Sequence, residues 1–288
     1  MSAVLALATS LLWGFADFGG GILTRRIKAL TVVVVSQTIA VAALGVIVLA
    51  TGAWSEASDR LWFAVAAGAV GPLAMFCFYK ALALGPMGVV SPLGTVGVVV
   101  PFGAGLVIHA ERPDLLQLGG IAVAVTGVVL AAGPQLRGAP VQRQTVWLTL
   151  VAALGFGATM AFIAEASTTL NGLFLALFVQ RVVNVAVGAP VLWAGTLRGG
   201  AAFPEGGARS LIPALPALAF VGLADVAANG TYALATRSGP VTVAAVLASL
   251  YPVVTALAAR GLLHERLRGI QAAGAGLALA GTVLLASG

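Results

Sequence analysis

Ionisable and amide side chains stand inside apolar stretches of this sequence, where each of them costs free energy unless it has a function or a partner. Asp225 is followed by Asn229 and Tyr232. A helix places residues four and seven positions apart on one face, and such a face can bind a polar solute or relay a proton. Arg181, with Asn184 three residues later, is the candidate partner. The alternative is structural, an ion pair between Asp225 and Arg181 that holds two helices together.

Motifs of enzymes and of ATP-driven proteins are missing from the sequence. It has no Walker A sequence, no Gly-x-Ser-x-Gly elbow, and no His, Cys and Asp cluster at metal-ligand spacing. The single cysteine, Cys77, lies in an apolar run and is expected to be a small buried hydrophobic residue. We therefore expect no enzymatic activity, no cofactor and no bound metal.

The composition excludes most classes of protein. Of 288 residues, 60% are hydrophobic and 8% are charged, whereas a soluble domain has about 25% charged residues. The mean hydropathy is +1.07. These values exclude a soluble domain and a disordered chain. The net charge of +6 forms no cluster beyond Arg25, Arg26 and Lys28, so no nucleic-acid partner is expected and the excess suits loops that face anionic lipid.

Charges, prolines and glycines divide the chain into apolar runs of about 20 residues, the length that spans a bilayer. This pattern predicts an all-α polytopic membrane protein, embedded in the lipid bilayer of the inner (plasma) membrane, with no extramembrane domain. Pro92, Pro101, Pro190 and Pro252 are expected to kink their helices. Ten helices are predicted, at 3–22, 30–51, 61–81, 88–108, 115–133, 146–165, 172–195, 211–234, 240–259 and 269–286.

Two further charges are interpreted as boundary residues. Asp17 is expected at the solvated end of its helix, near Arg25 and Arg26, and Lys80 is expected to extend its ammonium to the membrane surface. Glycines repeat along 115–133 and 269–286, where small side chains allow close approach of helices. These two helices are predicted to pair with each other or with a second subunit.

The second half of the sequence repeats the first. With a shift of 154 residues, 17 of the 52 positions in 81–132 are identical to those in 235–286. With a shift of 143, Gly14 matches Gly157 and Gln37 matches Gln180. Five helices per half is an odd number, so the halves are predicted to be inverted-topology repeats at 1–133 and 146–288, as in secondary transporters.

The residues that repeat also carry a family resemblance. The run LLWGFADF in the first helix resembles the EamA-type members of the drug/metabolite transporter superfamily. So do YKALALGPMGVVSPLGTVGVVVP and its partner YALATRSGPVTVAAVLASLYPVVTALAARGLLHERLRGIQAAGAGLALAGTVLL. Amino-acid exporters similar to YddG are the nearest functional analogy. The second half departs from the pattern at one point, because Phe156 stands where the first half has Trp13.

The resemblance implies a central cavity lined by the first, third, fourth, sixth, eighth and ninth helices. It selects residues whose rings hold the apolar part of a solute and whose polar groups orient it. Together with Arg181 and Asn229, the predicted substrate site consists of Trp13, Tyr79, Ser91, Thr95, Met160, Asp225, Tyr232, Ser249 and Tyr251.

We therefore expect a secondary transporter that moves a small polar metabolite by alternating access, with amino-acid export as the first hypothesis. The alternatives are a sugar, nucleoside or drug carrier of the same fold and, less favoured, a non-transporting scaffold or an enzyme. Protons or a counter-solute are candidate coupling partners, and the chain is expected to be a monomer or a homodimer. Basic residues gather in the loops after the first, fifth, seventh and ninth helices, which puts both termini outside, whereas relatives in the resembled family usually keep both inside.

Overall fold

The computed structural model describes residues 1–100, 115–132, 142–166, 169–199, 202–203, 207–238, 247–248, 250–264 and 269–287, and all regular structure in these segments is helical. The chain runs through α1 (Ser2–Thr24), α2 (Ala29–Thr51), η1 (Ala53–Glu56), α3 (Leu61–Leu84), α4 (Met87–Gly94), η2 (Thr95–Val98), α6 (Leu115–Ala132), α7 (Arg143–Ala166), α8 (Leu170–Leu197), η3 (Gly207–Ala214), α9 (Leu215–Arg237), α11 (Tyr251–Leu262) and α12 (Gly269–Ser287). Here α denotes an α-helix and η a 3-10 helix.

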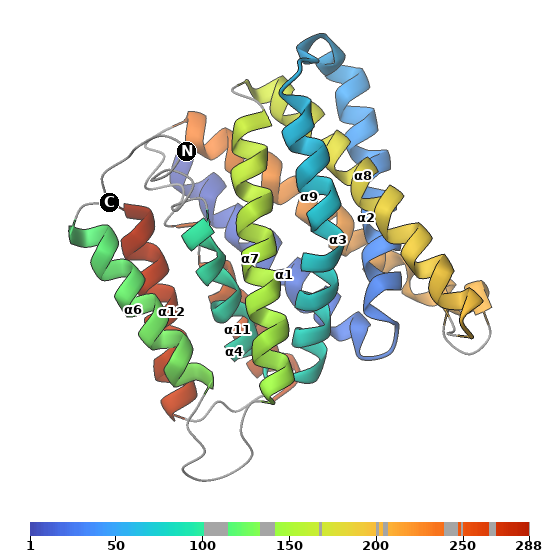
Figure 1. Cartoon of the computed structure of the whole chain (residues 1–288). Coiled ribbons are helices and arrows are strands. Elements are labelled where there is room, and N and C mark those ends of the chain that lie inside the picture. The colour runs from blue at the N-terminus through green and yellow to red at the C-terminus, as the bar shows by residue number, and fades with distance from the viewer. Residues whose placement is uncertain are drawn as a thin grey trace.

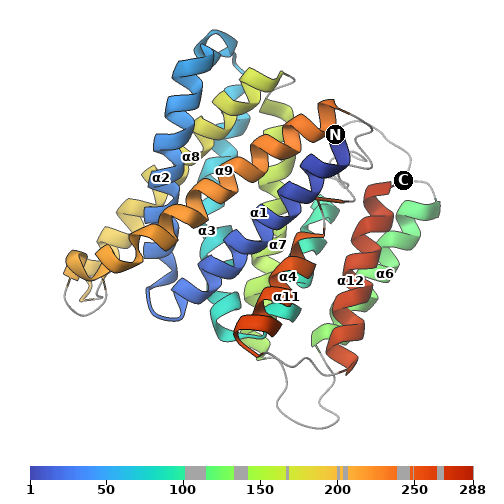
Figure 2. The same ribbon diagram turned by 180° about the vertical axis from the view of Figure 1, so that it is seen from behind.

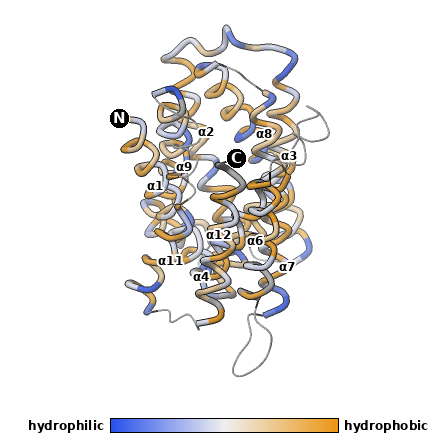
Figure 3. Tube along the Cα trace, turned by 90° about the vertical axis from the view of Figure 1, so that its left-hand side faces the viewer, coloured by the Kyte–Doolittle hydropathy of each residue, from blue (hydrophilic) through white to orange (hydrophobic). Residues whose placement is uncertain are grey.

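Each predicted apolar run contains one of the ten α-helices of the described residues, which confirms the all-α membrane fold. Among the described residues, six helical segments are long and apolar enough to cross a bilayer on their own: α1, α2, α3, α7, α8 and the segment from η3 into α9. The apolar residues lie mainly along the helices and hydrophilic residues mark their ends (Figure 3). Both ends of the chain lie at the same end of the bundle (Figure 1).

The packing of the helices follows a two-fold pattern. In chain order, the helices of the first repeat correspond to those of the second as α1 to α7, α2 to α8, α3 to α9, α4 to α11 and α6 to α12. With this correspondence, the contact of α1 with α9 in one direction matches the contact of α7 with α3 in the other. Likewise α3 packs on α8 as α9 packs on α2, and α1 contacts α11 as α7 contacts α4. In Figure 1 α1 and α7 run in opposite directions, and Figure 2 shows α1 beside α9 and α11. The bundle is therefore built from two inverted repeats.

The pair of α6 and α12 has the same symmetry at the level of single atoms. A Cβ on Gly127 would collide with the backbone around Gly274 and Ala278, and a Cβ on Gly281 would collide with the backbone around Gly120 and Ala124. The two sets of residues are related by the shift of 154. Glycine is needed here because the two backbones touch. The predicted pairing of these two helices with each other is therefore present, through Gly127 and Gly281.

The helix predicted over 88–108 is interrupted, because α4 passes into the 3-10 helix η2 after only eight residues. Pro92 lacks the N–H that would continue the α-helical bonding, and its ring crowds the preceding turn. The Thr95 hydroxyl donates a hydrogen bond to the Pro92 carbonyl at 2.7 Å. Pro92 therefore lies inside α4 shortly before the change to 3-10 spacing, whereas Pro101 lies outside the described residues.

In the corresponding part of the second repeat, residues 247–248 are helical. The Leu250 amide donates to the Leu247 carbonyl at 3.3 Å, which is 3-10 spacing, and α11 starts at Tyr251. The shift of 154 carries η2 onto positions 249–252, so the two breaks occur at one repeat position. Pro252 stands in the first turn of α11, where a missing N–H costs nothing. Pro252 thus stands next to the change in spacing between the helical residues 247–248 and α11, and Pro190 lies inside α8.

Candidate functional site

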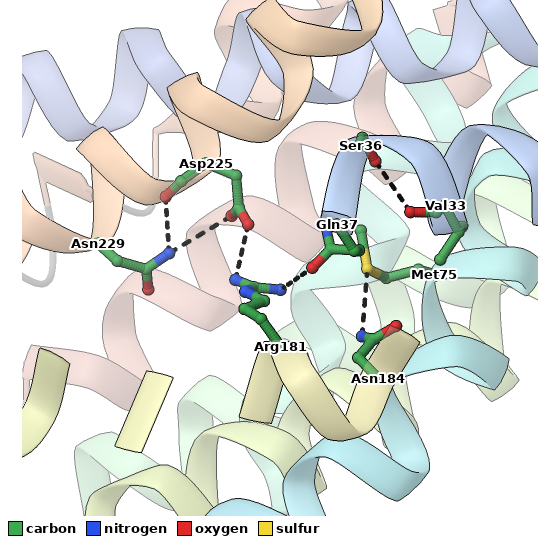
Figure 4. Close-up of polar contacts among 8 residues, drawn as sticks. All are labelled: Val33, Ser36, Gln37, Met75, Arg181, Asn184, Asp225 and Asn229. Carbon is green, nitrogen blue, oxygen red and sulfur yellow. Dashed lines mark hydrogen bonds and ion pairs between the residues drawn. The ribbon is translucent and has the colours of Figure 1, made fainter. Parts of the chain in front are cut away.

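A buried ionic layer joins α2, α8 and α9 (Figure 4). Arg181 on α8 places Nη2 2.6 Å from Oδ2 of Asp225 on α9. Its Nη1 donates a hydrogen bond to Oε1 of Gln37 on α2, at 2.8 Å. The predicted contact between Arg181 and Asp225 is present, so three helices from both repeats meet at one guanidinium group.

The three polar residues of α9 share the face predicted for them. Leu223, Ala227 and Leu234 are exposed on one side of α9, toward the surroundings of the bundle. At 100° per residue, Asp225, Asn229 and Tyr232 lie on the opposite side. All three are nevertheless only half-buried.

Asn229 is held by the residue one turn earlier. Its Nδ2 donates to the backbone carbonyl of Asp225 at 2.7 Å and lies 3.4 Å from Oδ1 of the same residue (Figure 4). The amide therefore orients the Asp225 carboxyl group and keeps its own oxygen available as an acceptor.

An aromatic group lies beside this face. The Trp13 ring on α1 is 5.9 Å, centroid to centroid, from the Tyr232 ring and also 5.9 Å from the Tyr251 ring, the latter in an edge-on arrangement. Trp13 points inward, because Leu7, Leu11 and Phe15 occupy the opposite, exposed side of α1. Like Tyr232 and Tyr251, it is half-buried.

Asp17 follows Trp13 by one turn on the inward side of α1 and is half-buried. The expectation that it is a solvated residue at a helix end is wrong. α1 continues for seven residues beyond Asp17, about two turns, and Asp17 lies within electrostatic range of Asp225 and Tyr251. Tyr79 is buried on α3 within range of both carboxyl groups and of Arg181, and its ring fills the space that Gly20 leaves open.

Several buried polar atoms of the ionic layer have no hydrogen-bond partner among the described residues. They include Nε of Arg181, Nε2 of Gln37, Oδ1 of Asn184 and Oε1 of Gln180. The amide nitrogen of Asn184 does have a partner, because Nδ2 donates a hydrogen bond to the Met75 sulfur at 3.8 Å (Figure 4). Buried donors and acceptors of this kind are places for water or for a polar solute.

The remaining predicted site residues are not part of the ionic layer or the aromatic group. Ser91 is fully buried in α4 and its hydroxyl has no hydrogen-bond partner among the described residues, whereas Thr95 bonds across to Thr282 of α12 at 3.0 Å. Met160 on α7 has 54% of its surface exposed and belongs to neither the ionic nor the aromatic group. Ser249 lies outside the described residues.

Two residues of the cluster were missed by reasoning from the sequence. Gln37 is an amide in the middle of the predicted helix at 30–51, and it matches Gln180, the neighbour of Arg181, in the repeat. That match was a usable signal for a shared polar layer. Asp17 was missed because it stands near the end of the predicted helix at 3–22. From that position it was expected to lie at the membrane surface and not inside the bundle. In the described part of the chain no group of three or more His, Cys, Asp or Glu residues can hold a metal ion.

Comparison with known proteins gives a consistent result. The profile of the EamA-like transporter family matches residues 1–133 and again 143–287. A search of curated proteins gave no match. A solved structure whose title reads "Crystal structure of protein" is similar, with a TM-score of 0.60 and 17% identity over 99% of this chain and 96% of that one. At this identity the similarity is one of fold.

Proposed function

The chain belongs to the EamA-like transporter family, and from this premise we propose that it exports an amino acid by alternating access through the site between α1, α8, α9 and α11. Membership makes it a multi-pass membrane transporter and not an enzyme. The proposal concerns the substrate, the residues that bind it and the membrane, for which we propose the plasma membrane.

One observation carries the proposal: two carboxyl groups, one guanidinium group and three aromatic rings converge in the apolar interior. The carboxyl groups of Asp17 and Asp225 outnumber the single guanidinium of Arg181. A cationic group on the substrate compensates this excess. An ammonium is favoured because the face of an aromatic ring attracts a cation, and Trp13 lies one turn from Asp17.

The other end of an amino acid is a carboxylate, for which Arg181 is the matching group. A guanidinium has five N–H donors in a fixed plane, and bonds to carboxylates in pairs. Here one terminal nitrogen contacts Asp225, the other contacts Gln37, and Nε has no partner among the described residues. A substrate carboxylate can therefore bind Arg181 by Nε or in exchange for Asp225.

Room for a substrate is indicated by exposure on inward faces. Trp13, Asp225 and Tyr232 point away from the exposed sides of their helices and are still only half-buried. Such residues border open space between helices. The helix breaks at η2 and before α11 lie beside α7 and α1. Interrupted helices in transporters expose backbone groups to a cavity and permit one part to rock against another.

Exchange with protons is the coupling that the same residues support. A proton can neutralise the surplus carboxyl group when the substrate ammonium is absent, so proton and substrate would compete for Asp17 and Asp225. We therefore propose proton–substrate antiport, with a counter-solute of positive charge as the alternative coupling partner.

The test is uptake into proteoliposomes containing the purified protein. The panel comprises radiolabelled amino acids, their decarboxylated amines, their desamino acids, and a neutral sugar and nucleoside. Saturable uptake of amino acids, with weaker uptake of compounds that lack either charged end, is expected. Uptake of the sugar or nucleoside without any amino acid would favour the alternative carrier class. Asp59→Asn, which makes the Asp-to-Asn change at an exposed position, is the matched control for changes in the site.

A further inference from the structure

A cavity of about 470 Å³ lies away from the ionic layer, where the ends of four helices meet. It is lined by the last turn of α1, the start of α2, the end of α3 and the C-terminal part of α8. In Figure 1 the lower ends of α3 and α8 diverge at this level. Lys28 and Lys80 line it, and these are the only two lysines in the sequence.

We propose that this cavity, which we term the lysine groove, binds the phosphodiester headgroup of an anionic membrane phospholipid. No acidic residue is among the described residues that line it. Lys28 and Lys80 therefore line the groove with no counter-charge among the described residues of its wall, and a phosphodiester supplies one.

The environment of each lysine fits an anionic ligand. Lys80 stands four residues before the end of α3, and its ammonium lies 5.5 Å from the centre of the Phe76 ring. The ring covers one side of the charge and leaves the others free to bond. Lys28 is exposed at the N-cap of α2, where no side chain caps the helix, so the free N–H groups of the first turn add positive potential beside it.

The apolar wall favours a lipid over a free anion. Leu84 and Val191 line the groove and are 41% and 57% exposed, so the groove opens along a surface that meets acyl chains. Gly195 leaves open space in the same wall, with no atom within 4 Å of a Cβ placed there. The volume is that of a small-molecule pocket, enough for a headgroup and the first part of a chain.

The position along the helices agrees with the headgroup level. The residues that line the groove are at the ends of α1 and α3 and the beginning of α2, where apolar runs stop. Lysines at such ends keep their methylene groups along apolar surface and their ammonium groups at the interface.

The experiment measures binding of lipid to the purified full-length protein in detergent, by native mass spectrometry and by the shift in melting temperature. The probes are phosphatidylglycerol, phosphatidylcholine and sodium phosphate. The variants are Lys28→Gln/Lys80→Gln and, as a control that removes two charges from the same end of the bundle outside the groove, Arg26→Gln/Arg209→Gln. Each lysine is expected to contribute about fivefold to the affinity for phosphatidylglycerol, since a basic residue near an anionic surface contributes about 1 kcal/mol.

A second pair of variants separates the groove from general charge. Gly195→Trp fills the groove without changing charge, and Gly276→Trp places the same side chain in open space on α12. Loss of phosphatidylglycerol binding in Lys28→Gln/Lys80→Gln and in Gly195→Trp, with binding kept in both controls, supports the proposal. Equal loss in the Arg26→Gln/Arg209→Gln control, unchanged binding in Gly195→Trp, or equal protection by sodium phosphate overturns it.

Discussion

Gly14 on α1 and Gly157 on α7 have the same role in the two repeats, since each packs against a backbone carbonyl at a helix break. A Cβ on Gly14 would lie less than 3.0 Å from the Tyr251 carbonyl oxygen, and a Cβ on Gly157 would collide with the Gly97 carbonyl oxygen. Tyr251 and Gly97 are themselves 154 residues apart. The first helix of each repeat thus supports the interrupted helix of the other repeat.

This relationship predicts that Gly157→Ala and Gly14→Ala each destabilise the protein. The added methyl group meets backbone that cannot rotate away, and overpacking of this kind costs about 1–3 kcal/mol. Melting temperature in detergent is the measurement. Gly119→Ala on α6 is the control, because nothing lies within 4 Å of its Cβ. Melting temperatures that match the control would mean that the backbone at Tyr251 and Gly97 can move away from the added methyl groups without loss of stability.

The aromatic group predicts a graded effect of changes at Trp13. If its ring binds a substrate ammonium, Trp13→Phe keeps part of the attraction and Trp13→Leu removes it. At about 0.5–2 kcal/mol for such an interaction, the leucine variant is expected to bind substrate between twofold and thirtyfold more weakly. Calorimetric binding to purified protein measures this. Equal affinities for the phenylalanine and leucine variants would show that the ring acts by size alone.

Asp17→Asn is predicted to uncouple transport from protons. Unlike a carboxyl group, the amide does not take up and release a proton in the accessible pH range. The substrate-driven release of protons is therefore expected to disappear while substrate–substrate exchange continues. A pH-sensitive dye inside proteoliposomes follows the protons, and radiolabelled substrate follows the exchange. Asp59→Asn should behave as the unmodified protein in both. Proton release that persists in Asp17→Asn would place the coupling group elsewhere.

The sequence predicts the helices and the residues that share a helix face, but it does not predict how deep in the bundle a residue such as Asp17 lies. Apolar runs predicted the helices, because the bilayer sets their length, and the spacing of Asp225 and Asn229 predicted their common face. The site of Asp17 depends instead on how α1 packs across α9. That crossing is set by contacts between repeats, which no local pattern encodes. Gln37 carried a signal through the repeat, but only the structure shows that it accepts a bond from Arg181.

The orientation of the chain is open to a direct test. The excess of basic residues in the loops at the end opposite the termini predicts that both termini face outside. A cysteine added after the last residue should react with a membrane-impermeant reagent in intact cells. Cys77 is buried and should give little background. Protection of the added cysteine until the cells are opened would instead place the termini inside.

Asp225 and Arg181 together decide between a binding role and a structural role for the ionic layer. Asp225→Asn keeps the volume of the side chain, and if Asp225 orients substrate it is expected to fold while reducing transport about tenfold, which equals roughly 1.4 kcal/mol. If the pair mainly holds α8 to α9, the same change leaves Arg181 buried without its ion-pair partner and destabilises the protein by about 3–5 kcal/mol.

The double change Asp225→Asn/Arg181→Met completes the comparison, because it removes both charges and keeps a long side chain on α8. A structural pair predicts that the double variant regains stability and retains transport. A binding pair predicts that it is stable and inactive, since neither end of the substrate finds its counter-charge. Melting temperature and flux, measured for both single variants and the double variant, distinguish the two roles. Normal flux in a stable Asp225→Asn protein would remove Asp225 from the site.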